Sequence, residues 1–370
     1  MLKRTAILAC LLPILVTSLA AQSGTWIEVH TAHFLIVANS NEKESRRTAR
    51  QFESMRAVFQ RVFPDADLDT AEPILVLAVE DKQNLQDLEP VAYLGLGQLN
   101  LMGLFLSAPE RNYVLILLNA PGLHPYASVY HEYAHFVFGR THEWMPLWLT
   151  EGIAEFYQNT EILDDKVRLG KAEPYMQSVL EHNALLPLPT LFAVDTHSPY
   201  YHEQDKGSIF YAESWALTHY LKDKDDLENT HRLNDYLDLL QAKDPVAAAT
   251  QAFGDLNELL GELRKYIVST KYAVSEITGS MDVNDSSFSV QPLSRAQTGN
   301  LRAEFLARVG RYSDARTLLQ AIVKDDPANA TAYATSCYID VREQEFDDAR
   351  KFCQQAIKFD SANYMGQYWY

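Results

Sequence analysis

The sequence His131-Glu132-Tyr133-Ala134-His135 lies in a predicted helix, Tyr126 to Phe138, with Pro125 near its first turn and Gly139 just past its end. Residues four apart return to nearly the same face of a helix. His131 and His135 can therefore reach one metal ion while Glu132 points toward the same cavity. The pentapeptide predicts a metal site on this helix.

A second predicted helix, Leu147 to Tyr157, follows closely and contains two glutamates. A catalytic zinc takes three protein ligands and keeps a fourth position open, and Glu151 is well placed to be the third. The sequence therefore predicts one Zn²⁺ per chain, bound by His131, His135 and Glu151. Glu155 follows one turn later, where it could orient His131 through its second ring nitrogen; the alternative is a solvent-exposed helix charge.

This pattern resembles the gluzincin metallopeptidases, in which HExxH is followed by a helix with a segment such as Glu151-Gly152-Ile153-Ala154. The chain is similar to the compact bacterial peptidase-MA-like group over Gln22 to Val268. The resemblance implies a zinc-dependent peptidase in which Glu132 is the general base that activates the attacking water. No Gly-Ala-Met-Glu-Asn-like segment precedes the motif, so aminopeptidase specificity is not implied, and cleavage within peptides stays open.

In the aminopeptidase relatives, a tyrosine that begins a downstream helix stabilises the oxyanion. Tyr211 stands at about the corresponding distance, so the resemblance implies this role for it; the alternative is an aromatic residue at the edge of the core. The histidines without paired spacing are expected to be surface residues or hydrogen-bonding partners: His124, His142, His202 and His219. Two of these, His202 and His219, are the next candidates for the oxyanion role.

The rest of the chain predicts an α+β fold. A helix is expected over Asn41 to Phe63, and strands over Trp26 to Ala38, Ile74 to Val79 and Tyr113 to Leu118. Strands and helices that alternate ahead of a helical second half indicate a small mixed sheet with a helical lobe. Further helices are predicted over Tyr175 to His182, Ile209 to Leu221, Thr230 to Leu240 and Val246 to Tyr266.

The C-terminal part shows an internal repeat, because Gly310-Arg311-Tyr312-Ser313-Asp314-Ala315-Arg316 is echoed, with a period of 34, by Gln344-Glu345-Phe346-Asp347-Asp348-Ala349-Arg350. The pattern resembles tetratricopeptide repeats, which implies an all-α tail and a possible protein partner. We expect a gluzincin-like domain over residues 22–278, a linker over 279–293 and repeats over 294–370 that pack on the preceding helices.

The N-terminal residues have the pattern of a cleaved signal peptide, with Lys3, Arg4 and an apolar run from Thr5 to Leu19. We expect residues 1–21 to be removed, no stable membrane span to remain, and the mature chain to be periplasmic or secreted; an uncleaved anchor is the alternative. In the exported chain Cys337 and Cys353 fall on facing helices, where two buried thiols are favoured over a disulfide.

Composition excludes one class of partner. The 370 residues carry a net charge of −17 without a basic cluster, which argues against nucleic acid. A peptide or protein substrate is expected instead. Two other functions stay open: an interaction protein with a vestigial metal site, and a non-peptidase zinc hydrolase. The intact Glu132 argues against the first, because a structural zinc site has no use for a general base.

Overall fold

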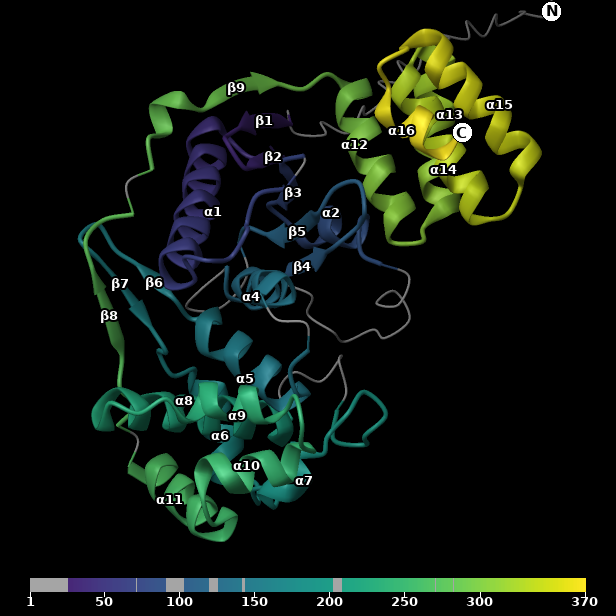
Figure 1. The fold of residues 1–370 in the computed structure, drawn as a ribbon. Helices are drawn as coiled ribbons and strands as arrows, with labels where there is room; N and C mark the ends of the chain where they lie inside the picture. The colour runs from purple at the N-terminus through teal and green to yellow at the C-terminus, as the bar shows by residue number, and fades with distance from the viewer. Residues whose placement is uncertain are drawn as a thin grey trace, which may run out of the picture.

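The computed structural model of the chain describes residues 26–70, 72–90, 103–119, 126–141, 144–201, 208–269, 271–281 and 283–370. The signal peptide expected over residues 1–21 lies outside these ranges and stays a prediction. Within them, no helix is both long and apolar enough to cross a membrane. The described residues form a mixed sheet with helices on both faces and a lobe of helices beyond one edge, which confirms the α+β class (Figure 1).

Six strands of the described part form the main sheet in the order β4-β5-β3-β2-β1-β9. The neighbours β2, β3 and β5 run parallel and are fully buried, whereas β1, β4 and β9 pair antiparallel. Strands buried on both faces are continuous apolar runs in the sequence, which is why β3 and β5 were predicted. The stretch Trp26 to Ala38, predicted as a strand from its rough alternation, forms the two strands β1 and β2. The strand bounds are β1 Ile27–His30, β2 Phe34–Ala38, β3 Ile74–Val79, β4 Gly103–Leu106, β5 Tyr113–Leu117 and β9 Ser289–Pro292.

One face of the sheet is covered by α1 (Glu42–Val62) and α4 (Ala127–Thr141). α1 begins where the side chain of Asn41 accepts a hydrogen bond from the backbone nitrogen of Glu44 at 3.0 Å. Its apolar residues recur at helical spacing and are buried against the strands. The predicted helices at Asn41 to Phe63 and Tyr126 to Phe138 are confirmed to within a few residues.

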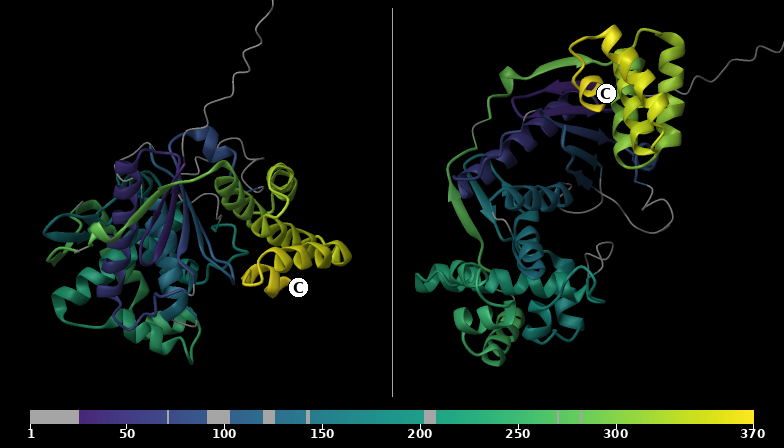
Figure 2. Two further views of the ribbon diagram at one scale, coloured as in Figure 1. Left: turned by 90° about the horizontal axis from the view of Figure 1, so that it is seen from above. Right: turned by 45° about the vertical axis from the view of Figure 1, so that its right-hand side comes forward.

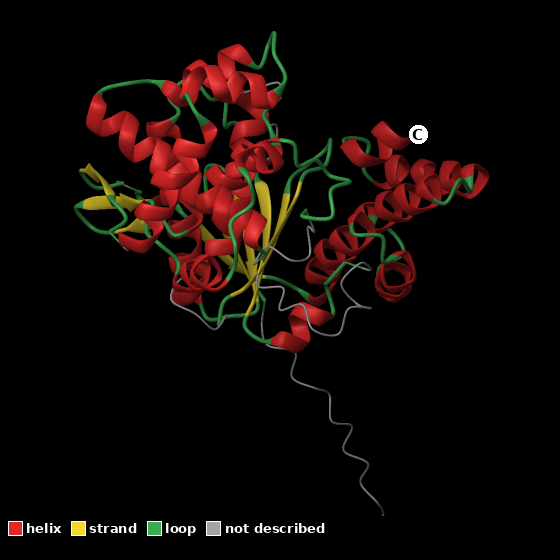
Figure 3. Ribbon diagram, turned by 90° about the horizontal axis from the view of Figure 1, so that it is seen from below, coloured by secondary structure: helices red, strands yellow, loops and turns green. Residues whose placement is uncertain are grey.

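The opposite face of the sheet is covered by α2 (Lys82–Gln86) and by the C-terminal helices (Figure 2). Successive side chains of a strand point to opposite faces. In β3, Leu75 and Leu77 therefore lie in a second core cluster, together with Phe305 of α12 (Arg295–Arg308). We expected the C-terminal repeats to pack on the preceding helices. This expectation was incomplete, because the C-terminal helices also form one layer of the sheet's core (Figure 3).

The C-terminal helices pair as α12 with α13 and α14 with α15, and equivalent positions behave alike. Gly310 and Gln344 both adopt a positive φ between paired helices, and Asn329 and Asn363 both cap the helix that follows. The two cysteines form a disulfide with 5.2 Å between their Cα atoms, so the preference for two thiols was wrong. The bounds are α13 Tyr312–Asp325, α14 Ala330–Arg342, α15 Phe346–Phe359 and α16 Tyr364–Trp369.

The remaining helices form a lobe beyond α4, with a small sheet β6-β7-β8 beside it. The helix predicted over Val246 to Tyr266 is divided, because Gly254 has a φ of 86°. The segment expected as a linker contains β9, which pairs with β1. The bounds are α5 Leu147–Gln158, β6 Glu161–Ile162, β7 Lys166–Leu169, α6 Pro174–His182, α7 Leu188–Phe192, α8 Ile209–Glu228, α9 Arg232–Leu239, α10 Pro245–Phe253, α11 Leu256–Ser269, β8 Ser275–Thr278 and the short 3-10 helix Asp285–Ser287.

Candidate metal centre

The histidines of the motif lie on α4, whose orientation is set by buried aromatic residues. Tyr130 and Tyr133 pack into the core between α4 and the sheet. The side-chain amide of Gln51 on α1 donates a hydrogen bond to the Tyr130 hydroxyl. Because these residues fix one face of α4 against the core, His131 and His135 project from the adjoining face toward α5.

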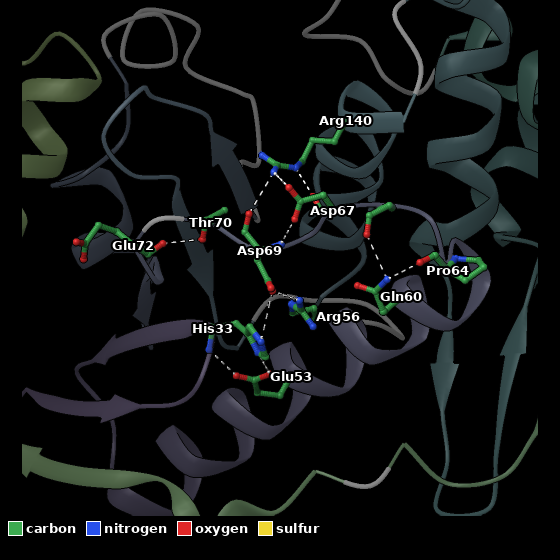
Figure 4. Close-up of polar contacts among 11 residues, drawn as sticks. His33, Glu53, Arg56, Gln60, Pro64, Asp67, Asp69, Thr70, Glu72 and Arg140 are labelled. Atoms are coloured by element: carbon green, nitrogen blue, oxygen red, sulfur yellow. Dashed lines mark hydrogen bonds and ion pairs between the residues drawn. The ribbon is translucent and has the colours of Figure 1, made fainter.

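The C-terminal end of α4 is held by Arg140. Its guanidinium donates to the Asp67 carboxylate at 3.1 Å and to the carbonyl oxygen of Asp69 at 3.2 Å, in the loop that follows α1 (Figure 4). Asp69 in turn forms an ion pair with Arg56 on α1. This network ties the helix that carries the histidines to α1. No pattern in the sequence predicted this network, because Arg140 and Asp67 are 73 positions apart.

α5 brings the predicted third ligand to the histidines. The helix begins after Pro146, and Trp148 anchors it by donating from Nε1 to the Tyr236 hydroxyl at 3.2 Å. Trp148 is fully buried and packs in the core. The next turn places the buried Glu151 opposite α4. The predicted helix Leu147 to Tyr157 and the closeness of Glu151 to both histidines are confirmed.

Three ligand atoms converge at this point. Nε2 of His131 lies 3.1 Å from Nε2 of His135, and Oε2 of Glu151 lies 3.3 Å from the first and 3.4 Å from the second. A tetrahedral zinc with nitrogen and oxygen ligands at about 2.0–2.1 Å separates its ligand atoms by about 3.4 Å. The three atoms therefore have the spacing that one zinc ion requires. Within the described residues this is the one His/Cys/Asp/Glu group with such convergence.

The charge state of Glu151 also suits a cation. Burial by itself raises the pKa of a carboxyl group, but the two imidazoles whose Nε2 atoms lie 3.3 and 3.4 Å from its Oε2 hold the pKa of Glu151 well below the usual range. The carboxylate is therefore ionised at neutral pH, which is the form that binds a metal.

Glu155 lies behind His131. Its Oε1 is 3.3 Å from Nδ1 of His131, the ring nitrogen that faces away from Glu151, and its side chain is 1% exposed. This burial excludes the alternative of a solvent-exposed charge. Gln158, one turn further on, donates from Nε2 to the same carboxylate. Gln158 was not predicted, although its spacing of three residues from Glu155 on a helix was a usable signal.

Glu132 and Tyr211, the two predicted catalytic residues, have different surroundings. Glu132 lies on α4 between the histidines and is partly exposed. Tyr211 lies in the first turn of α8 and is fully buried, with its ring stacked on that of Tyr201 at 6.0 Å. Burial raises the pKa of Tyr211 far above its usual value, and the negative charge of Glu151 raises it further. Tyr211 therefore keeps its hydroxyl proton at neutral pH, and the hydroxyl can donate a hydrogen bond.

Of the four histidines predicted to be surface residues or hydrogen-bonding partners, only His219 lies within the described residues. His219 is buried, and burial lowers its pKa. Its Nε2 donates to the carbonyl oxygen of Gly170 at 2.8 Å, so Nδ1 accepts from the Tyr266 hydroxyl at 2.8 Å. Both ring nitrogens are thus engaged within the fold, as expected for a hydrogen-bonding partner, and His219 has no free nitrogen for an oxyanion. The other three histidines without paired spacing lie outside the described residues.

No protein-family model and no curated protein matches this chain. The chemistry of the site is therefore inferred from its own residues.

Proposed function

We propose that this protein is an exported zinc-dependent peptidase with one Zn²⁺ held by His131, His135 and Glu151. The observation that carries the proposal is the triangle of Nε2, Nε2 and Oε2 atoms with sides of 3.1–3.4 Å. Two neutral imidazoles and one carboxylate form the donor set of catalytic zinc, and a fourth position is left for water or substrate. Bound zinc would polarise the scissile carbonyl and lower the pKa of the attacking water.

The chain's own residues then have separate roles. Glu132 takes a proton from the attacking water and later delivers it to the leaving amine. Glu155 holds Nδ1 of His131, so that Nε2 stays free of a proton and is directed to the metal. Tyr211 donates its hydroxyl proton in a hydrogen bond to the developing oxyanion. Its neutral form persists because burial and the charge of Glu151 raise its pKa.

The finer fold assignment is part of the same proposal. A mixed sheet with an antiparallel edge strand beside the HExxH helix, followed by a helical lobe that supplies the third ligand, supports a gluzincin-type domain. The shared cap and positive-φ positions support tetratricopeptide-like repeats in the tail. The Cys337–Cys353 disulfide supports export, since such bonds persist in oxidising compartments.

The proposal is tested by incubating the purified mature chain with a proteome-derived peptide library and a parallel ester library. Glu132→Gln, which retains all three ligands, is the control. New peptide termini that form with the wild type and disappear with Glu132→Gln are the expected result. Hydrolysis confined to esters would instead favour a non-peptidase zinc hydrolase. Absence of both activities in zinc-loaded protein would favour an interaction protein with a vestigial metal site.

A further inference from the structure

Gly152 follows the ligand Glu151 in the interior of α5, where glycine is the least favourable residue after proline. Its contacts explain why a side chain is absent. A Cβ at this position would overlap Oγ1 of Thr218 and the carbonyl oxygen of Ser214, and it would lie 2.9 Å from the carbonyl carbon of Ser214. Two of these three atoms belong to the backbone of α8, which cannot rotate away. The helices α5 and α8 can therefore lie at their observed distance only if residue 152 is glycine.

The stripe of α8 that meets Gly152 also carries the tyrosine of the site. Tyr211, Ser214 and Thr218 are three and seven positions apart, so they lie along one side of the helix. Ser214 Oγ and Thr218 Oγ1 are buried and make no hydrogen bond among the described residues. Steric contact rather than hydrogen bonding thus sets the separation of the two helices along this stripe.

We propose that Gly152 is a positioning residue: its missing side chain lets α8 approach α5, and this approach sets where Tyr211, on the stripe of α8 that meets α5, lies relative to Glu151. An added methyl group would push against α8, because the three atoms nearest to it belong to Ser214 and Thr218. We expect the ligands on α4 and α5 to keep their places, because α5 is also packed against α4. The catalytic consequence rests on the proposed peptidase function, whereas the placement of Tyr211 does not.

The placement is tested first without any reaction. 3-Fluorotyrosine is incorporated in place of Tyr211 in the full chain, and its ¹⁹F resonance is recorded with and without Gly152→Ala. The matched control is Gly261→Ala on α11, where a Cβ meets no atom within 4 Å. We expect the resonance to move in Gly152→Ala and to stay in Gly261→Ala, while both variants retain one zinc per chain. An unmoved resonance in folded Gly152→Ala would overturn the proposal.

The second test uses turnover. A misplacement of about 1 Å can reduce a rate by roughly a hundredfold, so Gly152→Ala should lower kcat to that extent with little change in KM. If Gly152 acts through Tyr211, the double variant Gly152→Ala/Tyr211→Phe should be no slower than either single variant. A lower melting temperature with unchanged kcat, or fully multiplicative losses, would reduce Gly152 to a packing role and overturn the proposal.

Two other results need separate tests: a Gly152→Ala variant that does not fold, and a wild type that cleaves no peptide. If Gly152→Ala does not fold, Thr218→Ile enlarges the same contact from the α8 side and is expected to give the same ¹⁹F shift and loss of kcat. If the wild type cleaves no peptide, the proposed function fails, while the ¹⁹F comparison still decides whether Gly152 places Tyr211.

Discussion

The Nε2 atoms of His131 and His135 lie 3.1 Å apart, one turn from each other on α4. Each of these nitrogens also lies within 3.4 Å of Oε2 of Glu151. At these distances all three atoms can bind the same cation. A proton can satisfy one nitrogen, but a metal ion satisfies all three atoms at once.

We therefore expect one zinc per wild-type chain and loss of that zinc in His131→Ala/His135→Ala, because a single carboxylate cannot hold the ion. Elemental analysis after gel filtration measures the stoichiometry. The melting temperature of the wild type should fall with a chelator, since an ion that binds only the folded state stabilises it. Full zinc retention in the double variant would remove the assignment.

Glu155→Gln should weaken zinc binding by about 10–100-fold without abolishing it, since the carboxylate orients His131 and does not touch the metal. Competition with a zinc chelator measures the affinity. Glu181→Gln, at an exposed position on α6, is the matched control and should behave as the wild type. Equal affinities for all three proteins would show that Glu155 has no part in metal binding.

Tyr211→Phe should lower kcat by roughly a hundredfold or more while zinc content and substrate affinity stay nearly unchanged, because a donor aimed at the oxyanion acts in the transition state. Tyr220→Phe is the control on the same helix, since the Tyr220 hydroxyl donates to Glu262. Near-normal kcat in Tyr211→Phe would assign the oxyanion to another donor. His219 is a poor second choice, as both its nitrogens are engaged.

A pH dependence of stability is expected from Glu213 on α8. Burial raises the pKa of this carboxyl to about 8, although its Oε2 accepts a hydrogen bond from the backbone nitrogen of Leu186 at 2.7 Å. A group whose pKa is raised on folding binds its proton more tightly in the folded state. Its contribution to stability is therefore complete below the unfolded pKa of ~4.3 and is lost as the pH rises to about 8.

The measurement is the free energy of unfolding in urea between pH 5 and 9, compared with that of Glu213→Gln. The glutamine keeps an oxygen for the Leu186 nitrogen and cannot ionise. The difference between the two proteins should change by up to about 1.4 kcal/mol per pH unit within this window. Parallel curves would show that Glu213 ionises in the folded protein as readily as in the unfolded chain.

The attachment of the C-terminal helices to the sheet can be tested at Arg308. Its guanidinium lies 3.2 Å from the Glu110 carboxylate and 3.7 Å from the Tyr338 ring centroid, and the charged pair is almost fully buried. Arg308→Met leaves the Glu110 charge buried alone and should cost about 3–5 kcal/mol. Arg308→Met/Glu110→Gln should recover part of this loss in urea unfolding. No recovery would show that the two charges are not coupled.

Several features were predictable from the sequence because they depend on local periodicity. The four-residue spacing of His131 and His135 fixes both rings on one helix face whatever surrounds the helix. The runs at β2, β3 and β5 are apolar at almost every position, so only burial on both faces suits them. The 34-residue echo showed that Gly310 and Gln344 are equivalent positions of a repeat, and both residues have a positive φ.

Other features were decided only when distant segments met. Glu155 could have been a surface charge until α4 covered it, and the two thiols became a disulfide because α14 and α15 bring their Cα atoms to 5.2 Å. The C-terminal helices lie on the sheet because one face of β3 is apolar and the short helix α2 covers only part of it. In the sequence Gly152 was only one residue of a motif. The structure shows that its missing side chain lets α8 approach α5. Periodicity determines which face a residue occupies, whereas its neighbour across the interface is set by tertiary packing.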